Sequence, residues 1–184
     1  INKDVYNNYI QIQLRKCKSM MEHPTWELPI NNKAALILTP CPGTKGVSLS
    51  ESVAQLKSQG VTVVVTALST QEMLESGVGA LSEEVANAGL QWFHTPIKDD
   101  SVPNLAFHSR WKGIAPSIRK ALDNGNKVAI HCMGGSGRTG LLAAHILLDQ
   151  GWELEDIITQ VQSLRPGAFT KDAQVEYIHE FAKK

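Results

Sequence analysis

Cys132 and Arg138 stand six positions apart and enclose a loop with three glycines, in the stretch HCMGGSGRTG at residues 131–140. The apolar run at 128–130 predicts a buried strand before the loop, and residues 138–149 predict a helix after it. Such a loop can turn successive backbone N–H groups inward, and the helix adds its own free N–H groups and the positive end of its dipole. We therefore expect an anion to bind at Met133, Gly134, Gly135, Ser136 and Gly137.

The residue types at the two ends of this loop indicate phosphoryl transfer. The N–H dipoles and the guanidinium of Arg138 favour the thiolate of Cys132 over the thiol, and a thiolate that faces a phosphoryl group is a nucleophile. The planar fork of Arg138 matches two phosphoryl oxygens and can hold the charge that develops on them in the transition state. Thr139 can donate its hydroxyl to the sulfur of Cys132 and stabilise the thiolate when it leaves, in a secondary role.

Three other interpretations of the loop fit the sequence less well. Cys132 could be a small core residue, but an arginine beside a helix N-terminus is unfavourable unless it serves an anion. The stretch GSGRTG at 135–140 also fits the dinucleotide pattern G-x-G-x-x-G, yet it lies late in the chain and no strand with a ribose-binding carboxylate follows it. A nucleotide-kinase loop is excluded because the lysine of that motif is missing.

The elements around the loop predict an α/β fold. The chain is expected to form a single domain over 1–184, in which 1–25 is an uncertain N-terminal extension. Short continuous apolar runs are typical of strands buried on both faces, so we expect a mostly parallel central sheet of about four to five strands flanked by helices. The runs lie at 34–38, 61–65, 90–93 and 128–130. Helices are predicted after the capping box at 48–51 and at about 80–88, 104–124, 138–149, 153–164 and 171–182, the last three covering one face of the sheet.

Composition narrows the class of protein. The 184 residues carry 18 basic and 18 acidic side chains, so bulk charge gives no reason to expect binding to nucleic acid or to an anionic membrane. Three cysteines are too few and too far apart for a disulfide scaffold or a zinc site, which favours a reducing, cytoplasmic location. No apolar run approaches the roughly 20 residues needed for a membrane span.

The loop resembles the C-x5-R-[ST] signature of the protein tyrosine phosphatase superfamily, in its compact dual-specificity branch and near the kinase-associated phosphatases. The likeness covers most of the chain beyond the first 25 or so residues, including 95–100 and 164–181. The resemblance implies a reaction in two steps, without metal or other cofactor. Cys132 takes the phosphoryl group as phosphocysteine, Asp99 protonates the leaving alcohol or phenol, and water hydrolyses the intermediate.

The resemblance also assigns supporting residues. In the family, the general acid is the aspartate of a P-I-x-D pattern, which Pro96 to Asp99 matches. Asp100 is adjacent, and spacing alone does not decide which of the two aspartates is the acid. Spacing is also compatible with a solvated turn at this pair that has no catalytic role. His131 is expected to order the loop through hydrogen bonds. Gln174 lies where some related enzymes place a water-positioning amide, although we predict that it lies on the outer face of its helix. Cys41 is a remote candidate for a resolving thiol.

The substrate is the least determined feature. The loop residues 133–136 carry no basic side chain, which argues against an inositide headgroup and for a phosphorylated protein as partner. The compact chain favours the dual-specificity type, which acts on phosphotyrosine and also on phosphoserine and phosphothreonine. Two alternatives stay open: a module that binds phosphate without turnover, and a phosphatase of a phosphoinositide or an RNA 5′-phosphate, which a basic rim would support. The sequence predicts no oligomeric state.

Overall fold

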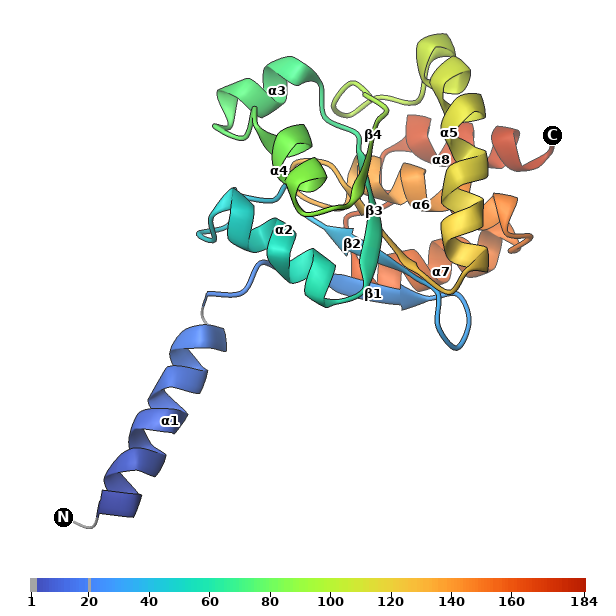
Figure 1. Cartoon of the computed structure of the whole chain (residues 1–184). Helices are drawn as coiled ribbons and strands as arrows, with labels where there is room; N and C mark the ends of the chain where they lie inside the picture. The colour runs from blue at the N-terminus through green and yellow to red at the C-terminus, as the bar shows by residue number, and fades with distance from the viewer. Residues whose placement is uncertain (1–2, 20) are drawn as a thin grey trace.

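A five-stranded sheet in the order β1-β2-β5-β3-β4 forms the centre of the computed structural model, which describes residues 3–19 and 21–184 (Figure 1). Its strands are β1 (Trp26–Pro29), β2 (Ala35–Thr39), β3 (Val61–Thr66), β4 (Gln91–His94) and β5 (Lys127–His131). Only β1 runs antiparallel to its neighbour, so the sheet is mostly parallel as predicted. The three inner strands, β2, β5 and β3, are buried almost throughout, which explains their continuous apolar runs.

Strand β1 has no counterpart in the sequence prediction. It is a four-residue edge strand in which only Leu28 is buried, while Glu27 and Pro29 are exposed. A short alternating segment that ends in proline gives a weak pattern, and proline is tolerated at a sheet edge because the outer N–H groups have no partner strand.

Helices cover both faces of the sheet (Figure 1). On one side lie α2 (Leu49–Ser58), α3 (Thr70–Glu75) and α4 (Leu81–Asn87); on the other lie α5 (Leu105–Asp123), α6 (Gly137–Asp149), α7 (Leu154–Leu164) and α8 (Asp172–Ala182). The three last helices cover one face, as predicted, with α5 beside them. The short helix α3 was missed, although a capping box of Ser69 and Glu72 begins it.

Helix α6 follows the glycine-rich loop at 133–137 and lies in the core. Residues 138–147 of this helix are all buried, because β2 and β5 lie on one side of it and α5, α7 and α8 on the others. A helix buried on all sides cannot shift easily, so the loop at its N-terminus has a fixed support.

Helix α1 (Lys3–Ser19) extends away from these layers in Figure 1, and the sheet begins only at Trp26. Residues 1, 2 and 20, which belong to the predicted extension, lie outside the described residues. The division into an extension at 1–25 and a single domain stays a prediction. Within the described part of the chain, no helix combines the length and the apolar character that a bilayer crossing requires.

Two of the buried histidines, His131 and His145, should make stability depend on pH. Burial lowers the pKa of His145 to about 3 and that of His131 to about 4, while both titrate normally once unfolded. The unfolded chain therefore binds more protons below about pH 6.5, and the free energy of unfolding falls as pH falls, by about 1.4 kcal/mol per pH unit for each histidine. Urea titrations between pH 7 and pH 4.5 should show this slope.

The variant His145→Gln is the control for this prediction, because it removes one of these two histidines. Its unfolding free energy should depend less steeply on pH than that of the native chain. An equal slope in both proteins would contradict the assignment of His145 as a group that stays neutral in the fold.

Candidate active site

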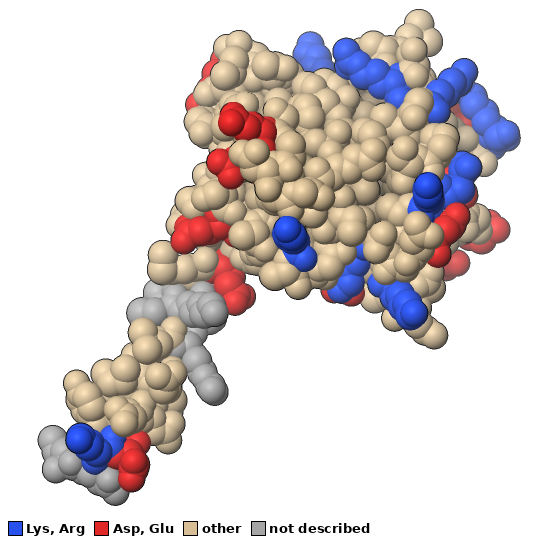
Figure 2. Space-filling model, in the orientation of Figure 1, with Lys and Arg blue, Asp and Glu red and all other residues tan. Residues whose placement is uncertain are grey.

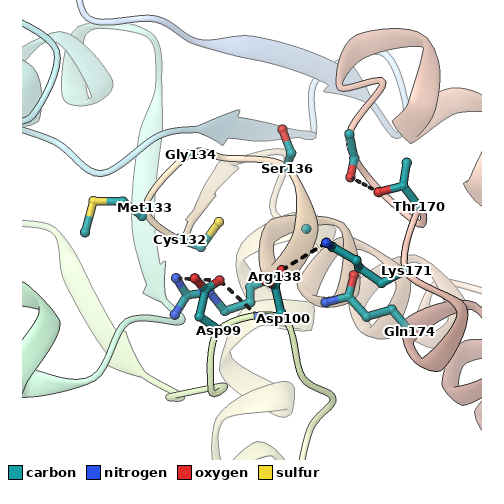
Figure 3. Close-up of a pocket in the computed structure, with 12 residues that line it drawn as sticks. Asp99, Asp100, Cys132, Met133, Gly134, Ser136, Arg138, Thr170, Lys171 and Gln174 are labelled. Atoms are coloured by element: carbon teal, nitrogen blue, oxygen red, sulfur yellow. Dashed lines mark hydrogen bonds and ion pairs between the residues drawn. The ribbon is translucent and has the colours of Figure 1, made fainter.

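A cavity of about 260 Å³ opens above the loop between β5 and α6 (Figure 3). The predicted loop residues Met133, Gly134, Ser136 and Gly137 all line it, and Cys132 lies at its base with 4% of its surface exposed. Gly135 lies outside the lining and has φ +75°, with an added Cβ only 2.6 Å from the carbonyl carbon of Thr39. The loop thus passes so closely over the end of β2 that only glycine fits there. The other lining residues are Asp99, Asp100, Arg138, Gly167, Thr170, Lys171 and Gln174.

Thr139 contacts the sulfur of Cys132, as the sequence predicted. Its hydroxyl Oγ1 lies 3.2 Å from Cys132 Sγ and donates to it, and both side chains are buried. Because Thr139 belongs to the first turn of α6, the same turn supplies the hydroxyl and the positive end of the helix dipole. This arrangement stabilises negative charge on the sulfur.

Arg138 is held by groups that the sequence analysis did not identify. Its Nη1 donates to Glu72 Oε1 at 2.8 Å and to the carbonyl of Ile97 at 3.1 Å, and only 3% of its surface is exposed. Burial alone would raise the pKa of Glu72, but hydrogen bonds from the Ser69 N–H and from Arg138 lower it overall. Glu72 therefore stays anionic and fixes one edge of the guanidinium.

Glu72 has two structural roles at once. Its Oε2 accepts from the N–H of Ser69 at 2.8 Å in the capping box of α3, while its Oε1 accepts from Arg138. The box S-x-x-E at 69–72 was the available sequence signal, although it indicates a helix start and says nothing of a partner 66 positions away.

The two candidate acids face different partners. Asp99 Oδ1 lies 3.3 Å from Arg138 Nη2 and also accepts from the N–H of Asp100 at 3.0 Å. Asp100 has φ +52° and directs its carboxylate toward Lys171 Nζ, at 3.7 Å. Figure 3 shows Asp99 beside the guanidinium and Asp100 turned toward α8. Both line the cavity, but Asp99 is the one beside the guanidinium of Arg138.

Gln174 contradicts the prediction that it lies on the outer face of its helix. It is 1% exposed and lines the cavity, and its Nε2 donates to the carbonyl of Ser101 at 3.0 Å. Its Oε1 is buried without a hydrogen-bond partner among the described residues. The reason is helical geometry: Gln174 lies one turn before the buried Ile178 and shares its face.

His131 is tied to the loop by a chain of three hydrogen bonds. The indole of Trp92 can only donate, and it donates to Thr66 Oγ1 at 2.9 Å. The carbonyl of Cys132 can only accept, so Nδ1 of His131, 3.0 Å away, carries the proton of the neutral ring, and Nε2 accepts from the hydroxyl of Thr66 at 2.7 Å. The ordering role predicted for His131 agrees with this geometry.

Two of the buried residues are cysteines with free thiols. Cys41 and Cys132 are free cysteines, and the side chain of Cys17 lies outside the description. The N–H of Cys41 donates to the carbonyl of Met133 at 3.0 Å, and burial, with the charges of Cys132 and Glu72, raises the pKa of the Cys41 thiol to about 12. Among the described residues, no group of three or more His, Cys, Asp or Glu is arranged to hold a metal ion.

Comparisons with known proteins agree with this geometry. Residues 43–152 match the family "Polymorphic toxin system, DSP-PTPase phosphatase". "Cyclin-dependent kinase inhibitor 3" of Rattus norvegicus is 32% identical, over 84% of this chain and 75% of that protein. "Tyrosine-protein phosphatase CDC14" of Saccharomyces cerevisiae is 34% identical, over 43% of this chain and 14% of its own length.

A solved structure shows the same likeness in three dimensions. The crystal structure of kinase associated phosphatase with its catalytic site cysteine substituted by serine superimposes with a TM-score of 0.74 at 25% identity, covering 88% of this chain and 95% of that one. The similarity therefore covers most of the chain and is not confined to the loop.

Proposed function

This chain belongs to the dual-specificity phosphatase (DSP-PTPase) family, and from that premise we propose that Cys132, Arg138, Asp99 and Thr139 perform its reaction. The protein is a cysteine-dependent protein phosphatase. One observation above all supports the assignment of roles: a thiol bonded by Thr139 lies at the base of a cavity whose wall holds a buried arginine and a carboxylate beside it.

In the first step, the Cys132 sulfur attacks phosphorus as the bond to the ester oxygen breaks. The fixed edge of Arg138 faces Glu72 and Ile97, so its Nη2 and Nε remain to bind two phosphoryl oxygens. The Nη2 donor lies 3.3 Å from Asp99 Oδ1, so a phosphate that takes this donor has the carboxyl group of Asp99 beside its ester oxygen. Protonated Asp99 can give its proton to the leaving oxygen.

In the second step, water attacks the phosphocysteine and the sulfur leaves as thiolate. Asp99, now ionised, accepts a proton from that water, and the Thr139 hydroxyl stabilises the departing sulfur. Gln174 suits the task of orienting the water, because its Oε1 is a buried acceptor with no partner among the described residues and the side chain lines the cavity. The products are inorganic phosphate and the free enzyme.

A phosphorylated protein is the substrate class that the charges favour. The cavity lining combines Asp99 and Asp100 with Arg138 and Lys171, so its rim is not broadly basic. In Figure 2, acidic side chains lie toward α2, α3 and α4 and basic ones are more numerous toward α5 and α8, and no single charge covers the face. The names of its relatives make a phosphorylated protein kinase the first candidate to test.

Replacing Asp99 by asparagine should reduce hydrolysis of a phosphotyrosine or phosphothreonine peptide by about a hundredfold or more, because the leaving oxygen then departs without a proton. Hydrolysis of para-nitrophenyl phosphate should fall less, since nitrophenolate leaves readily. The high-pH side of the kcat profile, where a general acid has lost its proton, should change with it. Steady-state kinetics on both substrates measure these effects.

Asp100→Asn is the matched control, as it removes the adjacent carboxylate that faces Lys171. It should retain peptide hydrolysis within a few-fold of the native rate. If Asp100→Asn showed the large, leaving-group-dependent loss and Asp99→Asn did not, Asp100 would be the acid and our assignment would be wrong.

The proposed function is tested by substrate classes measured side by side. With EDTA present, the chain should hydrolyse para-nitrophenyl phosphate and phosphopeptides, and should be much slower on a phosphoinositide in micelles and on an RNA 5′-phosphate. Faster turnover of either non-protein substrate would favour that alternative. Phosphopeptide binding with no turnover of any ester would indicate a binding module.

A further inference from the structure

Arg165 contacts the phosphate-binding loop from its outer side. The residue follows α7, and its Nη2 donates to the carbonyl of Gly134 at 2.8 Å while its Nε donates to the carbonyl of Gly135 at 2.9 Å and to Ser136 Oγ at 3.1 Å. The guanidinium lies over the ring of Trp26 in β1, 3.8 Å from the ring centre. Arg165 does not line the cavity, so it is placed to act through the loop.

The geometry of the peptide group shows how this contact orients the N–H groups of the loop. All described peptide bonds are trans, and in a trans peptide the carbonyl and the following N–H point in opposite directions. Because the carbonyls of Gly134 and Gly135 point at Arg165, the N–H groups of Gly135 and Ser136 point away from it, toward the inner side of the loop. Neither N–H has an acceptor among the described residues, so both are available to an anion.

From these contacts, and resting on the proposed function, we propose that Arg165, stacked on Trp26, is a positioning residue that keeps the loop's N–H groups turned toward the phosphate. Glycine peptides rotate more freely than others, and a rotated peptide would present a carbonyl oxygen to the phosphate in place of an N–H group. Three hydrogen bonds from a rigid planar fork oppose that rotation.

The charge of Arg165 also acts on the nucleophile. Burial lowers the pKa of Arg165, and the negative charge of the Cys132 thiolate opposes that shift. Interaction between two charges is mutual, so the guanidinium stabilises the thiolate in turn. The two effects can be separated, since a lysine would retain the charge and lose the fork.

Trp26, on which Arg165 stacks, lies in an edge strand of the sheet. Trp26 is partly buried in β1, the antiparallel strand that is most distant in the sheet from β4. A cation over an aromatic face gains attraction without forming a hydrogen bond, so the guanidinium keeps its donors for the loop. Removing the ring should therefore loosen Arg165 and produce a weaker form of the same defect.

The variants Arg165→Met and Arg165→Lys test this inference. In the full chain, Arg165→Met should raise the inhibition constant of inorganic phosphate by about tenfold or more and lower kcat, as expected when charge-assisted hydrogen bonds are lost. Arg165→Lys should keep the pH dependence of Cys132 alkylation by iodoacetamide near native while phosphate still binds weakly. Trp26→Leu should show a smaller loss, and Trp26→Phe a smaller one still.

Arg119→Met is the matched control, because Arg119 also donates two hydrogen bonds, to Asp149, but stands outside the cavity lining. It should leave phosphate inhibition unchanged. The inference is overturned if folded Arg165→Met has a phosphate inhibition constant and a kcat within twofold of the native values. Should that variant not fold, the same result in Trp26→Leu would overturn it.

Phosphate binding can also be measured as protection of Cys132 from alkylation, which needs no turnover. Failure of this inference is therefore distinguishable from failure of the proposed function.

Discussion

The variant Cys132→Ser should lose turnover of every phosphate ester by at least about a thousandfold, because its hydroxyl is not ionised by the groups that stabilise a thiolate. The helix N-terminus, the loop N–H groups and Thr139 all remain, so the cavity keeps its affinity for anions. The expected result is therefore a protein that binds phosphopeptide and does not hydrolyse it. Stopped assays for phosphate release and calorimetric peptide binding measure the two properties separately.

Cys41→Ser is the control for that result. Cys41 is also a buried free cysteine, and its backbone bonds the residue after Cys132, but its thiol is un-ionised. We expect it to retain turnover within a few-fold. Residual ester hydrolysis in Cys132→Ser close to the native rate would rule out a phosphocysteine, whatever Cys41→Ser does.

The variant Arg138→Lys should lower kcat/KM by about a thousandfold, since an ammonium cannot bond two phosphoryl oxygens while also contacting Glu72 and the Ile97 carbonyl. Both ground-state binding and the transition state use the fork, so KM should rise and kcat should fall together. Initial-rate kinetics on a phosphopeptide and on para-nitrophenyl phosphate test this, and the loss should be similar on both because Arg138 does not serve the leaving group.

Arg119→Lys is the parallel conservative change at an arginine whose carboxylate partner is Asp149, outside the cavity lining. It should leave kcat/KM unchanged. A loss of less than about tenfold in Arg138→Lys would mean that charge alone suffices and that the two-point contact is not what the transition state requires.

The sequence could predict the sheet and the loop because both depend on local patterns. Continuous apolar runs gave β2, β3, β4 and β5 to within about a residue, and the Cys132–Arg138 spacing placed the loop at the end of β5. Strand β1 was not predicted because exposed and buried residues alternate over only four positions. Helix α3 was not predicted because six residues are too few to show a periodic apolar face.

Residues that join distant segments were the ones that sequence reasoning missed. Glu72 meets Arg138 across 66 positions, and Arg165 meets the loop across about 30, so no local spacing relates them. Gln174 was placed wrongly for another reason: its polarity outweighed its one-turn spacing from Ile178 in our interpretation, although a polar side chain is well placed when it faces a polar cavity. The choice between Asp99 and Asp100 depends on backbone torsion at Asp100, which no motif specifies.

Direct detection of the phosphoenzyme would test the central claim best. The chain is mixed with a phosphopeptide, the reaction is stopped in acid within milliseconds, and the digested protein is analysed by mass spectrometry, with Gln174→Ala used to slow hydrolysis of the intermediate. We predict a phosphoryl group on the peptide that contains Cys132, appearing before inorganic phosphate reaches its steady rate. Rapid turnover with no phosphoryl group on Cys132, or with one on another residue, would contradict the mechanism.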